Sequence, residues 1–172
     1  MSHNQKNQYD KKDSLEIGNK AESLFVKLAK ARDWQVEYAT NQQDMNEHWD
    51  YRLSKQGTTY LIDVKARKRI NRGDSHVQDD WVWTELHGVR PTDQGWLFGG
   101  KADLIAFERA ADFIIVKSSD LRDLMPKLVE KTFVKTAQEA KYKLYRREGR
   151  RDIITLIKMS DLESIVLSKW NF

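Results

Sequence analysis

Two aspartates and a lysine lie around a β-hairpin predicted in the N-terminal half of the chain: Asp50, Asp63 and Lys65. Side chains alternate along a strand, so Asp63 and Lys65 share one face while Ile62 and Val64 point to the other. Carboxylates are the ligands that hard cations such as Mg²⁺ prefer, and an ammonium is a point-charge partner for a phosphate oxygen. The spacing therefore indicates a site for a divalent cation and a phosphate.

The register of this hairpin decides whether the two aspartates meet. A turn centred on Gln56 and Gly57 pairs residues whose numbers sum to 113, which places Asp50 directly across from Asp63. Their Cβ atoms would lie about 4.5–5.5 Å apart, and like charges so placed are destabilising. A hairpin has no structural need for two facing carboxylates, whereas the binding of a divalent cation requires such ligands. A slip of one residue would place the two acids on opposite faces.

Each of these residues has a plainer interpretation. An isolated Asp-X-Lys is common and is usually an ion pair on an edge strand. Glu22 lies on the preceding predicted helix, beside the apolar stripe and in line with Gly18, Phe25 and Ala29. Packing of that helix on the sheet would bring Glu22 to the edge of the carboxylate pair. By its position alone, Glu22 is better interpreted as an ordinary solvent-facing acid.

The elements that must position these residues follow from hydrophobic periodicity and turn signals. The pattern predicts a mobile polar arm over residues 1–12, a helix from Asp13 or Ser14 to about Arg32, and a polar loop over 41–47. Ser119 or Asp120 caps a second helix. The predicted strands cover residues 34–38, 48–53, 59–66, 81–86, 102–107 and 113–116, and a late hairpin covers 142–147 and 153–159. The sequence thus predicts one mixed α/β domain over residues 13–172.

The order of a helix glutamate, an aspartate, a hairpin and a strand ending in Asp-X-Lys resembles the PD-(D/E)xK nuclease superfamily. The helix followed by a tryptophan-containing strand also resembles the opening of Holliday-junction resolvases and phage endonucleases. The resemblance covers Gly18 to about Arg69, and Trp49 replaces the proline of the family motif. It implies a restriction-endonuclease-like fold, in which a mixed β-sheet is flanked by helices.

The resemblance also implies roles for individual residues. Asp50 and Asp63, with the backbone carbonyl of Val64, would bind Mg²⁺, for which Mn²⁺ can substitute. Glu22 would contact a second metal ion or a metal-bound water, and Lys65 would orient the attacking water. The implied reaction is hydrolysis of DNA phosphodiester bonds, by an endonuclease of recombination, repair, restriction or phage DNA processing.

The distribution of charge agrees with a polyanionic partner. The net charge is +4, but residues 65–72 and 141–151 each carry +5, so the rest of the chain carries −6. Two basic segments on an acidic body predict a polyanion-binding face, although solvated charged loops are an equal alternative. The four cations that follow the strand beside the site are the expected phosphate contacts: Arg67, Lys68, Arg69 and Arg72. The second segment is either another clamp or a solubilising loop.

Three aromatic or acidic side chains are weaker candidates. Glu85 shares a strand face with Trp81 and Trp83 by parity and is a candidate accessory acid. Trp96 or Phe98 is available to stack on an exposed base, although packing in a turn is the simpler interpretation. The four histidines lack paired zinc-ligand spacing.

Composition excludes several classes of protein. The chain has no cysteine, which excludes disulfides, cysteine nucleophiles and thiolate metal sites. No apolar run approaches the length of a bilayer crossing, and the N-terminus lacks the apolar core of a secretory signal. We expect a soluble cytoplasmic protein.

Two functions besides an active nuclease agree with these patterns. One is a non-catalytic DNA-binding protein with the same fold, although every proposed catalytic position holds a competent residue. The other is an unrelated α/β protein that binds no divalent metal and whose basic segments bind RNA or a protein. Cutting of branched DNA would call for a symmetric homodimer.

Overall fold

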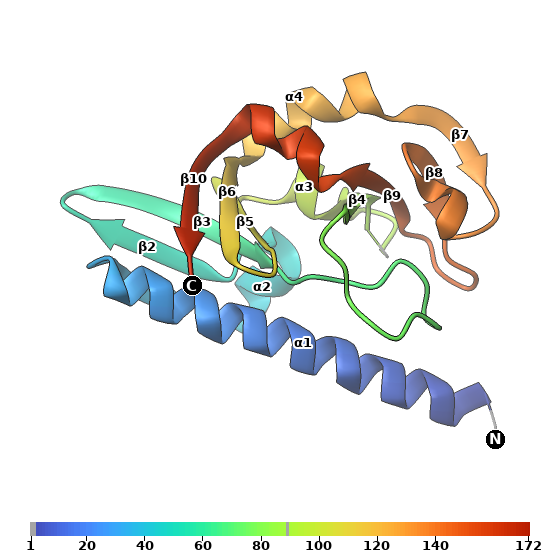
Figure 1. Ribbon diagram of the computed structural model, residues 1–172, viewed down its shortest axis with the longest axis horizontal. Helices are drawn as coiled ribbons and strands as arrows, with labels where there is room; N and C mark the ends of the chain where they lie inside the picture. Colours follow the sequence, from blue (N-terminus) through green and yellow to red (C-terminus); the bar gives the residue numbers. More distant parts are fainter. Residues whose placement is uncertain (1–2, 89) are drawn as a thin grey trace.

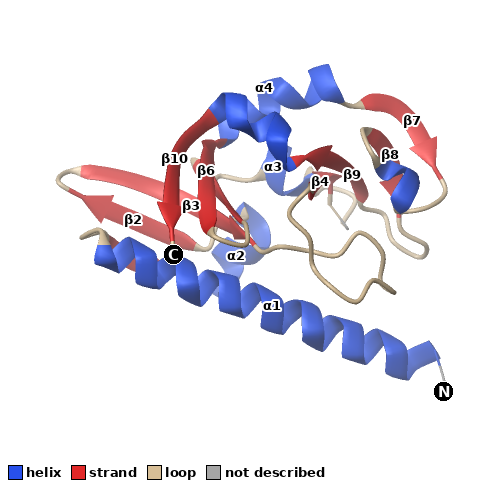
Figure 2. Ribbon diagram, viewed as in Figure 1, coloured by secondary structure: helices blue, strands red, loops and turns tan. Residues whose placement is uncertain are grey.

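Residues 3–88 and 90–172 are described by the structure, a computed structural model. They form one α/β domain with mixed sheets flanked by helices, as the sequence predicts (Figures 1 and 2). The helices are α1 (His3–Ala31), α2 (Asn41–Glu47), α3 (Gly95–Gly99) and α4 (Ser118–Leu128), with short 3₁₀ turns η1 (Gln138–Ala140) and η2 (Met159–Ile165).

A six-stranded sheet has the order β1-β2-β3-β5-β6-β10. β3 and β5 are parallel and the other neighbours are antiparallel, so the sheet is mixed. Its strands are β1 (Gln35–Tyr38), β2 (Tyr51–Lys55), β3 (Thr58–Lys65), β5 (Leu104–Glu108), β6 (Asp112–Lys117) and β10 (Val166–Asn171).

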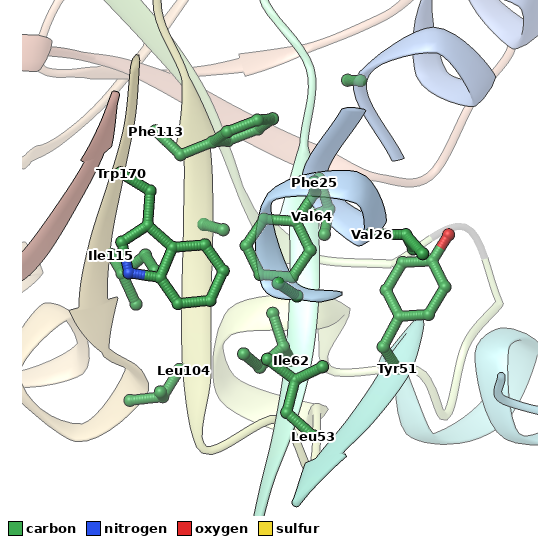
Figure 3. Packing of buried hydrophobic residues seen from close by; sticks show 13 residues of the cluster. Phe25, Val26, Tyr51, Leu53, Ile62, Val64, Leu104, Phe113, Ile115 and Trp170 are labelled. Atoms are coloured by element: carbon green, nitrogen blue, oxygen red, sulfur yellow. The ribbon is translucent and has the colours of Figure 1, made fainter. Parts of the chain in front are cut away.

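One face of this sheet packs against α1. Phe25 of α1 stacks on Trp170 with ring centroids 5.1 Å apart and on Tyr51 at 6.4 Å (Figure 3). Ile62 and Val64 of β3 belong to the same buried cluster. Because these two residues face α1, Asp63 and Lys65 point to the opposite face of the sheet.

The opposite face packs against a second, four-stranded sheet and two helices. The second sheet has the order β4-β9-β8-β7, with strands β4 (Trp81–His87), β9 (Ile153–Lys158), β8 (Lys143–Arg146) and β7 (Glu130–Val134). Ile105 and Ile114 of the first sheet share a buried cluster with Leu97 of α3, Leu121 of α4 and Ile157 of β9. β5 and β6 are therefore buried on both faces, which explains their short, continuously apolar sequences.

Three expectations about helices are wrong. α4 begins at Ser118 after an N-cap at Lys117, so neither Ser119 nor Asp120 caps it. α1 begins at His3 rather than at Asp13 or Ser14, so residues 3–12, expected as a mobile arm, lie within the helix. That segment has no Gly or Pro and contains Gln and Lys, which extend helices readily. Residues 41–47 form α2 rather than a loop. The Thr40 hydroxyl accepts a hydrogen bond from the Gln43 N–H while the Gln43 side chain accepts one from the Thr40 N–H.

In the described ranges, no helix is both long and apolar enough to cross a bilayer. α1 has the length, but polar residues occur along it. This agrees with the absence of an apolar run in the sequence.

Candidate functional site

The hairpin of β2 and β3 has the predicted register. Tyr51 pairs with Ile62 and Lys55 pairs with Thr58, so partner numbers sum to 113. Gln56 and Gly57 occupy the turn with φ values of 48° and 81°. Positive φ at both central residues is the geometry of a type I′ turn, whose twist matches that of the flanking strands. The two-residue turn therefore sets which residues of β2 and β3 face each other.

Asp50 lies one residue before β2 and is bound to the backbone on both sides of Asp63. The Asp50 N–H donates to the Ile62 carbonyl at 2.8 Å, and the Asp50 carboxylate accepts from the Val64 N–H at 2.6 Å. These two bonds hold the Asp50 carboxylate against the segment that carries Asp63. The structure thus brings together the two acids that the register argument paired.

Asp63 is nearly inaccessible to solvent, with 4% of its surface exposed. Lys65 Nζ lies 2.7 Å from Asp63 Oδ2, yet that oxygen accepts no hydrogen bond of normal geometry from the described residues. The same ammonium lies 4.5 Å from the centre of the Trp96 ring. Trp96, on α3, also packs edge-on against Phe107 of β5. Lys65 is therefore held between a carboxylate and an aromatic face.

The electrostatics of Asp50 are those of a buried acid beside another acid. Burial, and then the negative charge of Asp63, raises the pKa of Asp50 to about 8. The Val64 N–H and the Lys65 ammonium oppose this rise but do not cancel it. At neutral pH, without a cation, the Asp50 carboxyl is mostly protonated.

Glu22 of α1 reaches the same group of charges. The Tyr51 hydroxyl donates to Glu22 Oε2 at 3.1 Å. Burial raises the pKa of Glu22, and the charges of Asp44 and Asp63 add to the rise. Glu22 is half-buried rather than the solvent-facing acid that its sequence position favours. Packing of α1 on the sheet accounts for this placement.

Tyr51→Phe is expected to destabilise the protein by about 1 kcal/mol, because a half-buried carboxylate loses a hydrogen-bond donor. Urea unfolding at neutral pH measures the change. Tyr60→Phe on β3 is the matched control, because the Tyr60 ring is half-buried against Trp34 but its hydroxyl has no hydrogen bond with the described residues. Equal effects of the two substitutions would show that the bond to Glu22 contributes nothing.

Glu85 of β4 also lies within electrostatic range of Lys65. Burial raises the pKa of Glu85, while the charge of Lys65 opposes the rise. Glu85 lies on the strand face that sequence parity predicts, together with Trp81 and Trp83. The second sheet thus contributes an acid to the region of Lys65.

Sequence reasoning missed Asp44, which lies on α2. The residue as a whole is exposed, but partial desolvation of its carboxylate and the charge of Asp63 raise its pKa. α2 ends at Glu47, and its C-cap His48, with a φ of 54°, turns the chain toward Trp49 and Asp50. The signal for α2 was present in the sequence as Thr40 followed three residues later by Gln43.

The expected DNA-binding cations differ in their exposure to solvent. Arg67 is bound to Asp79, and Arg69 Nη2 lies 2.8 Å from Asp13 Oδ2 of α1. Lys68 and Arg72 are exposed. Arg67 and Arg69 thus hold the segment after β3 in place. Burial of the Lys68 ammonium lowers its pKa, although the residue as a whole is exposed.

The fit of this site to a metal ion depends on the two aspartates. Within residues 3–88 and 90–172, no three side chains of His, Cys, Asp or Glu are grouped so as to hold a metal ion. Mg²⁺ needs no such group, since it often binds through one or two carboxylates plus substrate phosphate and waters. The raised pKa of Asp50 and the buried Asp63 oxygen without a hydrogen bond are features that a cation would relieve. The pair fits Mg²⁺ or Mn²⁺.

Comparison with known proteins identifies no relative of this chain. No family model, no curated protein and no solved structure matches this chain. The functional argument therefore depends on the geometry of the site.

Proposed function

We propose that the protein is a metal-dependent deoxyribonuclease that hydrolyses DNA phosphodiester bonds. The observation that carries the proposal is the pair of acids, Asp50 and Asp63, held together on one hairpin with Lys65 beside them. The fold has no evident use for two carboxylates in one partly buried place, because burial and their repulsion raise the pKa of Asp50. Metal-assisted attack on a phosphate uses acids and an ammonium in this combination.

In this proposal, Asp50, Asp63 and the carbonyl of Val64 hold Mg²⁺ or Mn²⁺. A cation bound there would lower the pKa of a water molecule and offset charge on the reacting phosphate. Lys65 contributes a movable ammonium, which leaves the Asp63 oxygen and orients the attacking water against the phosphate. Glu22, held by the Tyr51 hydroxyl, orients a second water at the edge of the pair.

The DNA backbone is proposed to pass over the segment that leaves β3. Lys68 and Arg72 are exposed there and are suited to phosphate contacts, which supply affinity without sequence information. Arg67 and Arg69 shape the segment through their ion pairs with Asp79 and Asp13. The biological process would be recombination, repair, restriction or phage DNA processing in the cytoplasm.

Cleavage of labelled linear, nicked and four-way-junction DNA tests the proposal. We expect cutting with Mg²⁺ or Mn²⁺ and none with EDTA, because without the cation Asp50 is mostly protonated and no bound water is activated. Preference for the junction would also call for a homodimer, which sedimentation would detect. Binding of DNA without cutting under any metal would instead favour a non-catalytic DNA-binding protein.

A further inference from the structure

One face of the second sheet carries aromatic rings next to exposed cations. Trp81 and Trp83 of β4 point to this face, whereas Val82 and Thr84 point into the protein and are buried. Tyr145 of β8 lies on the same face, because it pairs with Ile154 of β9, which pairs in turn with Glu85 of β4. We call Trp81, Trp83 and Tyr145 the aromatic face.

Trp81 is the best-placed ring of this face for contact with a ligand. The ring is half-buried and meets Tyr142 edge-on at 5.5 Å. Lys141 Nζ lies 4.9 Å and Lys158 Nζ 5.7 Å from the centre of the Trp81 ring, and both lysines are exposed. The two ammonium groups are thus held beside a flat apolar surface.

The charges around the aromatic face favour an anionic ligand. Lys141 begins the basic segment 141–151. The nearby acids are largely engaged: Asp152 is bound to Arg147, and Asp161 accepts from the Tyr142 hydroxyl at 2.6 Å. Asp80, next to Trp81, is exposed. Residues 141–151 and Lys158 together carry +6, which exceeds the three negative charges of Asp80, Asp152 and Asp161.

The aromatic face continues toward the candidate site. Trp83 contacts Tyr145 with ring centroids 6.3 Å apart, and its indole N–H donates to the Arg69 carbonyl at 3.0 Å. Glu85, two residues along the same strand face, is in electrostatic range of Lys65. The path from Trp81 through Trp83 to Glu85 therefore leads along β4 to the region of Asp63 and Lys65.

We propose that the aromatic face binds a single-stranded stretch of DNA that adjoins the bond to be cut. Unpaired bases present their faces to aromatic rings, whereas bases in a duplex are already stacked on one another. A base stacked on Trp81 would displace Lys141 and Lys158 from the ring toward the flanking phosphates. The inference rests on the proposed function for its choice of DNA and for the bond to be cut.

Fluorescence anisotropy in EDTA measures this binding without cleavage. The probes are a labelled oligothymidine and a duplex of equal length. We expect the parent protein to bind the single strand more tightly, and Trp81→Leu to weaken that binding about tenfold. Trp81→Phe keeps a ring for stacking and should retain most of the affinity.

Trp34→Leu is the matched control, since Trp34 is another half-buried tryptophan packed on a tyrosine, Tyr60, at 6.1 Å. If Trp81→Leu fails to fold, the exposed pair Lys141→Gln and Lys158→Gln tests the same face and should reduce both affinity and its salt dependence. Equal binding of duplex and single strand would overturn the inference, as would equal losses in Trp81→Leu and Trp34→Leu.

The two proposals can fail separately. Single-strand binding that depends on Trp81, without cleavage under any metal, would support the aromatic face and remove the nuclease. Metal-dependent cleavage, together with single-strand binding that substitution of Trp81, Lys141 and Lys158 leaves unchanged, would support the nuclease and remove the aromatic face.

Discussion

Asp63→Asn is expected to abolish metal-dependent DNA cleavage, lowering the rate by about a thousandfold or more. The substitution keeps the size of the side chain but removes the negative charge, which pairs with Lys65 and would bind the cation. It also removes the repulsion that helps to raise the pKa of Asp50, so that pKa should fall toward its ordinary value. Single-turnover cleavage with saturating Mg²⁺ measures the loss of rate.

Asp123→Asn is the control for this experiment, since Asp123 is an exposed acid on α4. Its cleavage rate should equal that of the parent. DNA binding in EDTA should be retained in Asp63→Asn, because the phosphate contacts are assigned to the basic residues. Cleavage at a near-parental rate by a folded Asp63→Asn variant would remove Asp63 from the reaction.

The contribution of Asp50 to the stability of the metal-free protein is expected to fall as the pH rises from about 4 to about 8. The pKa of Asp50 is raised from 3.8 to about 8, so the folded protein keeps a proton that the unfolded chain releases in this range. Unfolding is then favoured by up to about 1.4 kcal/mol for each pH unit, and the loss levels off above the folded pKa. Across the range, the contribution of Asp50 amounts to several kcal/mol.

Asp50→Asn should remove this contribution, so the variant should become more stable than the parent as the pH rises. Urea unfolding in EDTA at a series of pH values measures the difference. Glu22 and Glu85 also have raised pKa values, whereas acids such as Asp112 have lowered ones and act in the opposite direction. Only the difference between parent and variant therefore reports on Asp50. Parallel profiles of parent and variant would show that Asp50 is not buried beside Asp63 as described.

Much of the site's core was determined by the sequence alone. The hairpin register follows from a two-residue turn at Gln56 and Gly57 and from alternation along β3, and both depend on residues within a few positions of one another. Asp50 and Asp63 were placed together on these grounds. The α/β class followed from the same kind of local pattern.

The rest of the site depends on contacts between residues far apart in the sequence. Glu22 meets Tyr51 only because α1 packs on the first sheet, and Glu85 comes within electrostatic range of Lys65 only because the second sheet packs beside it. The ion pairs of Arg67 and Arg69 likewise need Asp79 and Asp13 to be brought close. Periodicity and turn chemistry carry no information about such partners, because they describe one element at a time. Tertiary packing decided which charges surround the hairpin.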